Sequence, residues 1–571
     1  MSENYGYLYN YGRWLHSDNI PTELHDELVS IKDDEVAQRD RFWCELSFGT
    51  GGLRGKLGAG TNRINELVVQ RATYGLTDYI KANKGKSVCI AYDTRNKSHE
   101  FAEVAAEVLC ANGLNVYLFA SVRPTPMLSF AVREKHAFSG IVITASHNPR
   151  EYNGYKVYGA DGGQITDNAA KLISESINLT DLLWRVPRIP LTQARQMKSL
   201  FDLDDVDTAY YENVKSLVIR KELVANNADK LSILYTPLHG TGNIPVRRVL
   251  NELGFTDFSV VKEQELPDGN FPTVLRPNPE EPETFKLALR QANGQDIILA
   301  TDPDCDRIGV RVKTSSGEYA TMSGNQVGAL LCEYIISAKR ESGTLCDKSA
   351  IVKTVVTTEL ARNICNENGI ALIEVLTGFK YIGEKIEQWQ KNKQHIFLFG
   401  FEESYGYLVG NFVRDKDAVI AATLICEMAL FYKLKGWTLV DALENLYSRY
   451  GYCDERLVSA TLDGEEGMQK VKAIMKQFRE EYVSIFEGRK IAKIEDYLTG
   501  IRGFPRSDVV KFKFADGCWL AVRPSGTEPK IKFYVGAVGK SKDEVILRLT
   551  ELNAVANSAV GGNNVRWPTI T

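Results

Sequence analysis

Residues 144–149 read Thr-Ala-Ser-His-Asn-Pro and carry the strongest chemical signal in the chain. They follow an aliphatic run, residues 141–143, that predicts a buried strand, and Pro149 disfavours a helix directly behind it. Ser146 is therefore expected in a loop at the carboxyl end of a core strand, the edge where α/β sheets bind ligands. Its hydroxyl is a candidate nucleophile, although a lone serine in such a loop is more often a turn residue.

Two residues near this serine could take part in the same chemistry. Lys156 follows in the same segment, and its ammonium could balance phosphate charge or shuttle a proton. A surface lysine is the ordinary alternative. His147 suggests a Ser–His pair, but adjacent residues of an extended segment point to opposite faces. We therefore expect His147 to be structural rather than a general base.

Three carboxylates recur at alternate positions of a second segment, namely Asp302, Asp304 and Asp306. Such side chains between two strands can surround a divalent cation, and oxygen ligands favour Mg²⁺ over zinc. A solvated acidic turn explains the three aspartates alone equally well. The glycine and the acid that an EF-hand requires later in its loop are absent, which sets calcium sensing aside. Arg307 either balances the acids or clamps a substrate phosphate with two N–H donors.

Two glycine-containing loops could bind anions through backbone N–H groups. Residues 523–527, Arg-Pro-Ser-Gly-Thr, join two expected strands, so a simple hairpin turn is the alternative. Residues 48–55 form either a flexible loop or a second anion-binding loop that carries Arg54. No Walker A motif is present and no GxGxxG motif follows a strand, so a nucleotide-dependent kinase or dehydrogenase is poorly supported. Together, the hydroxyl, the carboxylates and the anion loops indicate phosphoryl transfer.

Composition narrows the class of protein without identifying it. The chain has 571 residues, which favours about three to five domains, and its 44% apolar and 25% charged residues are typical of a soluble globular protein. A net charge of −4 with scattered Lys and Arg argues against nucleic acid or an anionic membrane as partner. The N-terminus does not resemble a signal peptide, and the longest apolar run, residues 418–432, is too short to span a bilayer. The ten cysteines lack paired spacing, which predicts reduced thiols and a cytoplasmic location.

The elements that must position these residues repeat one plan three times: apolar strand, amphipathic helix, strand, helix and strand. These strands are apolar on both faces, as strands of a parallel sheet covered by helices must be. In each repeat a polar loop follows the third strand, so three similar domains could direct these loops into one cleft. The expected strands are residues 88–94, 115–120 and 140–144, then 232–235, 258–262 and 296–301, then 350–357, 371–376 and 395–401.

The pattern changes from about residue 452. Strands are expected at residues 509–514, 519–523 and 530–535, followed by a terminal helix at residues 542–554. Strands that alternate without intervening helices suggest a smaller antiparallel α+β domain.

With these residues assembled, the chain resembles the α-D-phosphohexomutase superfamily, which includes phosphoglucomutases, phosphomannomutases and phosphopentomutases. The resemblance runs essentially end to end and rests on six motifs in the family's order, residues 48–54, 144–156, 302–307, 377–380, 401–404 and 523–529. It implies an α/β protein with three similar α/β domains, whose sheets are mixed and mainly parallel, and a C-terminal α+β lid around a central cleft. We expect domain boundaries at 1–225, 226–321, 322–451 and 452–571.

The resemblance also implies a role for each motif. Ser146 is similar to the serine that carries the phosphoryl group, which would also be a metal ligand. Lys156 and Arg307 match catalytic positions beside it, with Lys156 as the candidate general acid or base. The other matches are Asp302, Asp304 and Asp306 for the Mg²⁺ ligands, Glu402 and Ser404 for sugar hydroxyls, Arg523, Ser525, Gly526 and Thr527 for the non-reacting phosphate, and Arg54, Lys353 and Lys380 for further substrate contacts.

In the implied reaction, a phosphoserine donates its phosphoryl group to a sugar monophosphate, and the bound bisphosphate turns over and returns its other phosphate to Ser146. We expect interconversion of glucose 1-phosphate and glucose 6-phosphate, with glucose 1,6-bisphosphate as intermediate and activator. Phe401 stands where many members have glycine and resembles the branch of larger phosphoglucomutases and phosphopentomutases. Pentose or mannose phosphates, sugar-bisphosphate synthesis and non-catalytic phosphosugar binding are the alternatives. The expected partners are small sugar phosphates, and the sequence leaves the oligomeric state open.

Overall fold

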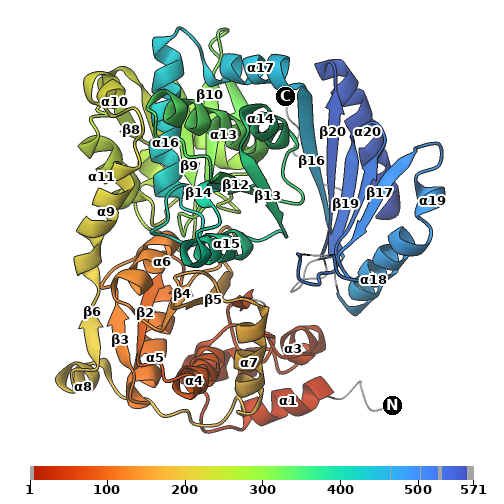
Figure 1. Ribbon diagram of the computed structural model, residues 1–571. Coiled ribbons are helices and arrows are strands. Elements are labelled where there is room, and N and C mark those ends of the chain that lie inside the picture. The colour runs from red at the N-terminus through yellow and green to blue at the C-terminus, as the bar shows by residue number, and fades with distance from the viewer. Residues whose placement is uncertain (1–5, 50, 463, 502, 525–529, 562–571) are drawn as a thin grey trace.

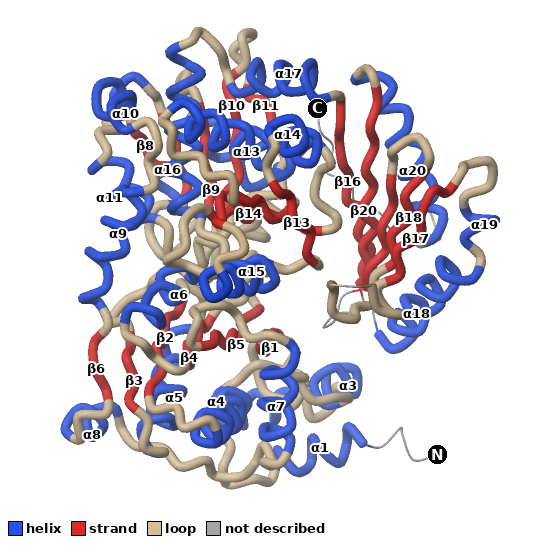
Figure 2. Tube along the Cα trace, viewed as in Figure 1, coloured by secondary structure: helices blue, strands red, loops and turns tan. Residues whose placement is uncertain are grey.

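The computed structural model describes residues 6–49, 51–462, 464–501, 503–524 and 530–561, which form four β-sheets with their associated helices (Figure 1). In Figure 2 the first sheet lies at the bottom, the second and third lie above it, and the fourth stands at the right. Among the described helices, none is long and apolar enough to cross a membrane.

The first sheet carries the serine loop at one of its strand ends. Its order is β1-β5-β4-β2-β3-β6, in which β4, β2, β3 and β6 are parallel and β5 and β1 are antiparallel to their neighbours. Since β5 pairs directly with β4, Ser146 lies in the return between two hydrogen-bonded strands. The strands are β1 (Gly52–Lys56), β2 (Ser87–Tyr92), β3 (Asn115–Leu118), β4 (Ser139–Ile143), β5 (Tyr152–Gly159) and β6 (Leu200–Asp202); the helices are α1 (Gly6–Leu15), α2 (Thr22–Ser30), α3 (Glu35–Phe42), α4 (Glu66–Ala82), α5 (Ser98–Ala111), α6 (Thr125–Glu134), α7 (Asp167–Asn178) and α8 (Leu191–Gln196).

The second sheet carries the aspartate loop between β9 and β10. Its order is β11-β10-β9-β7-β8, with β9, β7 and β8 parallel and the two outer pairings antiparallel. Parallel and antiparallel neighbours are therefore equal in number here, because the chain returns directly after the aspartates. The strands are β7 (Ile233–Thr236), β8 (Phe258–Val260), β9 (Ile297–Thr301), β10 (Ile308–Lys313) and β11 (Tyr319–Met322); the helices are α9 (Asp207–Ser216), α10 (Lys221–Asn227), α11 (Asn243–Glu252) and α12 (Lys286–Gln291).

The third sheet repeats this arrangement with one strand fewer. Its order is β13-β12-β14-β15, parallel except for the last pairing, so the turn that holds Ser404 again follows a parallel strand. The strands are β12 (Ser349–Thr354), β13 (Ala371–Val375), β14 (Ile396–Glu402) and β15 (Gly406–Leu408); the helices are α13 (Gly324–Glu341), α14 (Leu360–Asn368), α15 (Phe379–Asn392), α16 (Ala418–Leu434) and α17 (Leu439–Tyr450).

Helix α16, the longest apolar run of the sequence, is a core helix that is buried along almost its whole length. Its hydrophobic side chains belong to one core that also includes residues of the first, second and third sheets. The buried carboxylate of Glu427 accepts hydrogen bonds from the backbone N–H groups of Ile219 and Arg220 and from the Tyr334 hydroxyl. These bonds satisfy the one charged group that the helix carries into the core.

The fourth sheet is wholly antiparallel, in the order β16-β20-β19-β18-β17, and has its own core around Phe478, Phe512 and Phe533. The expected fold class is confirmed: three α/β domains with mixed sheets precede a C-terminal α+β domain. The strands are β16 (Tyr452–Thr461), β17 (Ile491–Asp496), β18 (Val510–Phe514), β19 (Trp519–Pro524) and β20 (Lys530–Gly539); the helices are α18 (Gly464–Glu480), α19 (Tyr482–Ile485) and α20 (Lys542–Ala559).

Candidate active site

The serine loop and the aspartate loop meet in direct contact. Ser146 is buried, and its Oγ donates a hydrogen bond to Asp302 Oδ2 over 2.8 Å. Ser146 has φ 52°, in the left-handed region that non-glycine residues seldom adopt. Thr144 stabilises this bend, because its Oγ1 accepts from the Ser146 backbone N–H at 2.8 Å and donates to Asp93 at 2.6 Å. Strain of this kind is concentrated at functional sites.

Arg95 anchors the serine loop through hydrogen bonds to its backbone, and sequence reasoning missed it. Its buried guanidinium donates to backbone carbonyl oxygens of the loop, including those of Ser146 and Asn148, and lies 3.4 Å from Asp93. These bonds tie the loop to the end of β2, next to β4 in the sheet. The available signal was the Asp-Thr-Arg sequence directly after an expected strand.

His147 does not point away from Ser146, so the expectation of opposite faces is wrong. The ring Nδ1 lies 3.0 Å from Ser146 Oγ, because the positive φ of Ser146 breaks the extended geometry on which that expectation depended. Burial, together with the charges of Arg307 and Arg54, holds the pKa of His147 well below its ordinary value. The imidazole is therefore neutral at physiological pH and contacts the serine hydroxyl without adding charge.

The three aspartates form a buried cluster in which one carboxylate oxygen from each lies within 4.8 Å of the others. In the described part of the chain, Asp304 Oδ1 and Asp306 Oδ1 accept no hydrogen bond. Burial and the charges of the other two aspartates raise the pKa of Asp302 well above its ordinary value. Unsatisfied, mutually repelling oxygens in the core are unfavourable without a cation, so this donor set fits a hard divalent metal ion.

Lysines on two elements partly neutralise this cluster. Lys156 on β5 lies 2.8 Å from Asp304 Oδ2 and 3.6 Å from Asp306 Oδ2. Burial alone would raise the pKa of Asp304, but the Lys156 ammonium holds it below its ordinary value. Lys416, which sequence reasoning missed, lies 2.7 Å from Asp306 Oδ2. Arg307 pairs with Glu280 beside the cluster and lies 3.9 Å from Asp306.

The sugar loop expected from the sequence adjoins the aspartate cluster. Glu402, at the end of β14, is buried, and burial raises its pKa to about 7 although the Lys416 ammonium opposes that rise. A side chain at Gly406 would overlap both Lys416 and Glu402, so the lysine stem crosses directly above β15. Ser404 lies in the turn between β14 and β15. Lys416 therefore lies between the loop that holds Glu402 and Ser404 and the aspartate loop.

The fourth domain contributes cations from the ends of β19 and β20. Arg523 and Lys532 face each other in the strand register, so their side chains share one face of the sheet. Lys532, which sequence reasoning missed, lies at the same end of the domain, and its charge contributes to the lowered pKa of His147. Ser525, Gly526 and Thr527 of the expected phosphate loop lie outside the described residues.

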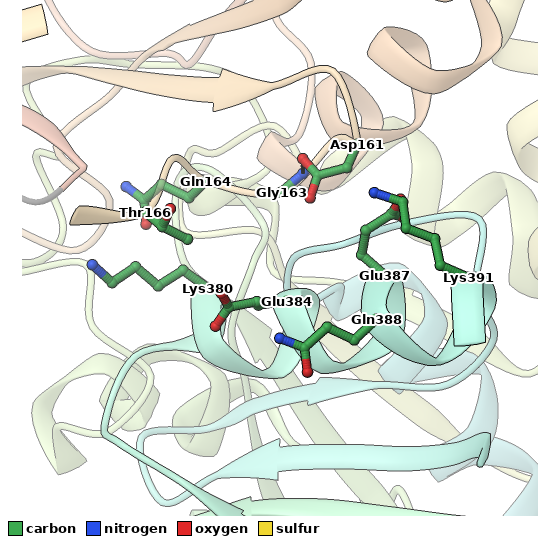
Figure 3. A pocket seen from close by; sticks show the side chains of 9 residues that line it. All are labelled: Asp161, Gly163, Gln164, Thr166, Lys380, Glu384, Glu387, Gln388 and Lys391. Carbon is green, nitrogen blue, oxygen red and sulfur yellow. Dashed lines mark hydrogen bonds and ion pairs between the residues drawn. The ribbon is translucent and has the colours of Figure 1, made fainter. Parts of the chain in front are cut away.

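The three remaining candidate residues, Arg54, Lys380 and Lys353, lie in three different surroundings. Arg54 donates to Asn148 Oδ1 over 3.2 Å and so adjoins the serine loop. Lys380, in the first turn of α15, pairs with Asp167 at 2.6 Å and lines a cavity of about 280 Å³ between α15 and the segment after β5 (Figure 3). Lys353 is fully buried and is not brought to the cluster, because its ammonium is held by carboxylates within its own domain.

Family models match the chain in the order of its sheets. Models of the phosphoglucomutase/phosphomannomutase alpha/beta/alpha domains I, II and III match residues 45–183, 208–317 and 323–450. The model of the C-terminal domain of the same family matches residues 461–547. The matched regions include strands of all four sheets and the loops that hold Ser146, Asp302 and Glu402; β6 and all but the last residue of β16 lie outside them.

Relatives along the whole chain agree with these models. Phosphoglucomutases of Staphylococcus aureus (strain MSSA476) and Staphylococcus haemolyticus are each 37% identical to it, covering 91% of this chain and 95% of the relative. The fold matches that of Paramecium pp63/parafusin, a phosphoglucomutase, with TM-score 0.66, 17% identity and coverage of 90% and 95% of the two chains. A Burkholderia thailandensis phosphoglucomutase/phosphomannomutase family protein gives TM-score 0.64, 18% identity and coverage of 91% and 99%. With four ordered domain models and full-length relatives in agreement, the chain belongs to the phosphoglucomutase/phosphomannomutase family of the α-D-phosphohexomutase superfamily and is an isomerase that moves a phosphoryl group within a sugar phosphate.

Proposed function

We propose that the protein is a phosphoglucomutase that interconverts glucose 1-phosphate and glucose 6-phosphate through a phosphoserine at Ser146 and a bound glucose 1,6-bisphosphate. The observation that carries this proposal is the 2.8 Å contact between Ser146 Oγ and Asp302 in a buried cluster of three carboxylates. Relatives from two staphylococcal species that bear the name phosphoglucomutase support glucose as the sugar. A cytoplasmic location belongs to the same proposal.

The residues around Ser146 divide the work of phosphoryl transfer. Asp302, Asp304 and Asp306 would hold Mg²⁺, which when bound neutralises charge on the transferring group. Lys156 is the candidate that gives a proton to, and takes it from, the sugar hydroxyl, since it is the cation nearest Asp304. Arg307 offers N–H donors to phosphoryl oxygens at the end of the same loop. These groups are positioned before substrate arrives, which favours electrostatic stabilisation of the transition state.

Recognition belongs to the third and fourth domains in this proposal. Glu402 and Ser404 bind adjacent sugar hydroxyls and so hold a hexose in either of two orientations. The residues that would hold the non-reacting phosphate are Arg523, Ser525, Gly526 and Thr527, with Arg54 and Lys380 as further contacts. Lys353 is not among the proposed contacts, because Glu359, Glu374 and the Thr357 carbonyl occupy its ammonium.

The four domains, with proposed boundaries at 1–225, 226–321, 322–451 and 452–571, would enclose the sugar phosphate together. Closure of the fourth domain as a lid would exclude water, which otherwise turns a phosphoserine mutase into a phosphatase. The bisphosphate can then reorient without leaving the site.

The test is a coupled assay that compares kcat/KM for glucose 1-phosphate, mannose 1-phosphate and ribose 1-phosphate, each with its matching bisphosphate. We expect glucose 1-phosphate to lead ribose 1-phosphate by tenfold or more, about 1.4 kcal/mol of transition-state binding. A tenfold preference for the pentose would overturn the glucose assignment. An assay with an acyl-phosphate donor and no bisphosphate serves as the control for sugar-bisphosphate synthesis.

A further inference from the structure

The turn formed by residues 355–359, here called the 355–359 turn, lies directly after β12 and receives a lysine from the fourth domain. Lys511 on β18 is fully buried, and its Nζ donates a hydrogen bond of 2.5 Å to the backbone carbonyl of Val355. The same ammonium lies 3.9 Å from Glu359 and 4.2 Å from the centre of the Trp519 ring.

An apolar contact surrounds this lysine. Val355, Val356 and Leu376 of the third domain form one cluster with lid residues that include Trp519 and Tyr534. A buried ammonium adds little net stability to such a contact, and an apolar residue of similar size often serves as well or better. Lys511 therefore does more than add to the stability of the contact: its hydrogen bond to the Val355 carbonyl, together with a hydrogen bond between Glu455 and Thr358, fixes where the lid sits against the turn.

The other side of the 355–359 turn holds the sugar loop. Glu403 Oε2 accepts hydrogen bonds from the hydroxyls of Thr354 at 3.1 Å and Thr357 at 3.3 Å. Glu403 stands between Glu402 and Ser404, the two proposed sugar contacts. The orientation of this loop thus depends on a turn that the lid also contacts.

Bonds within the turn make it a stiff connection. Lys353 Nζ donates to the Thr357 carbonyl at 2.9 Å and lies 3.2 Å from Glu359. The backbone N–H of Thr358 donates to Asn325 Oδ1 at 3.1 Å, which anchors the turn to the start of α13. Because packed segments switch between discrete arrangements, a shift on the lid side is passed to the sugar side.

We propose that the 355–359 turn couples docking of the fourth domain to the orientation of the sugar loop, with Lys511 as the positioning residue on the lid. This inference rests on the proposed function for the identity of the sugar contacts. Coupling of this kind is reciprocal, so substrate in the sugar loop also strengthens lid docking.

The first test is hydrogen–deuterium exchange without any ligand, which does not depend on the sugar used. In Lys511→Met, we expect faster exchange in the peptide that covers residues 400–406. In the reverse direction, Thr354→Val/Thr357→Val should speed exchange at residues 510–514 of the lid. Lys513→Met is the matched control, because Lys513 lies on the same strand but pairs with Glu495 inside the lid. Unchanged exchange at both remote segments overturns the coupling.

The second test measures sugar discrimination, which a lid contact alone would not change. Lys511→Met should reduce the ratio of kcat/KM for glucose 1-phosphate over mannose 1-phosphate by about fivefold, while Lys511→Arg restores part of it. Lys513→Met should leave the ratio unchanged. An equal loss for both sugars overturns the coupling. Wild-type enzyme without activity on either sugar would refute the proposed function, and the exchange experiment would still decide the coupling.

Discussion

The contact between the first and second domains and the contact between the third and fourth are built differently. At the first, Asp302 accepts a hydrogen bond from Ser146 Oγ, and Asp304 Oδ2 accepts from the Thr125 hydroxyl and the Lys156 ammonium. At the second, an apolar cluster and the bond from Lys511 join the lid to the 355–359 turn. Several polar bonds therefore hold the serine and aspartate loops in place. The lid instead rests on an apolar surface that can separate without leaving many charges unpaired.

This difference separates two kinds of expected defect. A change in the serine and aspartate loops should lower kcat, because those groups act on charge that develops in the transition state. A change in the lid should mainly raise KM, because we propose that the lid holds the phosphate that does not react. A lid substitution that lowers only kcat, or a substitution in the serine or aspartate loop that raises only KM, would contradict this comparison.

The largest effect is expected from the aspartate cluster. Asp304→Asn removes the charge that pairs with Lys156 and one of the proposed metal ligands, and we expect kcat to fall by about 10²–10³-fold. Circular dichroism should show a folded protein, and a Mg²⁺ titration followed by calorimetry should show weaker metal binding. Asp516→Asn, at a lid position paired with Arg489, is the control. Undiminished wild-type turnover in chelator would remove the metal from this account.

A smaller effect is expected at the lid. Arg523→Met should raise KM for glucose 1-phosphate by about tenfold or more, since a hydrogen bond to a charged group is worth about 1.5–3 kcal/mol, while kcat changes less. Steady-state kinetics measures both constants. Arg489→Met, which removes another lid arginine away from the phosphate loop, should leave KM unchanged. A fall in kcat with constant KM at Arg523 would place it with the reacting groups.

The smallest effect is a pH dependence of stability from Lys511. Burial, followed by repulsion from Lys353, lowers the pKa of Lys511 to about 7, while Glu359 and Glu374 act in the opposite direction and Lys513 adds repulsion. Between about pH 7 and the ordinary lysine value near 10.4, the unfolded chain binds one proton more than the folded chain. Stability from this group therefore rises with pH over that window.

Thermal unfolding of wild type and Lys511→Met checks this sign. The midpoint of the wild type relative to the variant should rise between about pH 7 and about pH 9.5. A difference that is constant or falls with pH would mean that Lys511 stays protonated in the folded chain.

Aliphatic runs predicted most of the sheets, because strands of a covered sheet need apolar residues on both faces. The strand expected at residues 140–144 is β4, and the strand expected at residues 296–301 is β9. The antiparallel returns β5 and β10 were not predicted, since they carry mixed residues such as Lys156 and Arg311. Because each of these strands pairs with the strand before its loop, they fix the direction in which the chain leaves the serine and aspartate loops.

The candidate site was predictable where one loop carries its own motif, and less so where partners come from distant segments. Lys416 contacts Asp306 from the segment before α16, and no local pattern links two residues so far apart. Lys353 shows the converse, because the resemblance implies a substrate contact while its ammonium is buried between Glu359 and Glu374. The orientation of His147 also escaped the sequence, because it depends on the φ of Ser146.

The measurement that tests the central claim most directly is the fate of the phosphoryl group. Enzyme treated with isotopically labelled glucose 1,6-bisphosphate and examined by peptide mass spectrometry should carry one labelled phosphate, on Ser146. When unlabelled glucose 1-phosphate is added, the label should pass to the sugar phosphate while Ser146 is phosphorylated again by the sugar's other phosphate. Ser146→Ala should carry none and lose at least about 10⁴-fold in turnover, while Ser404→Ala should still be labelled. Phosphate found reproducibly at another residue, or full activity in Ser146→Ala, would contradict the account.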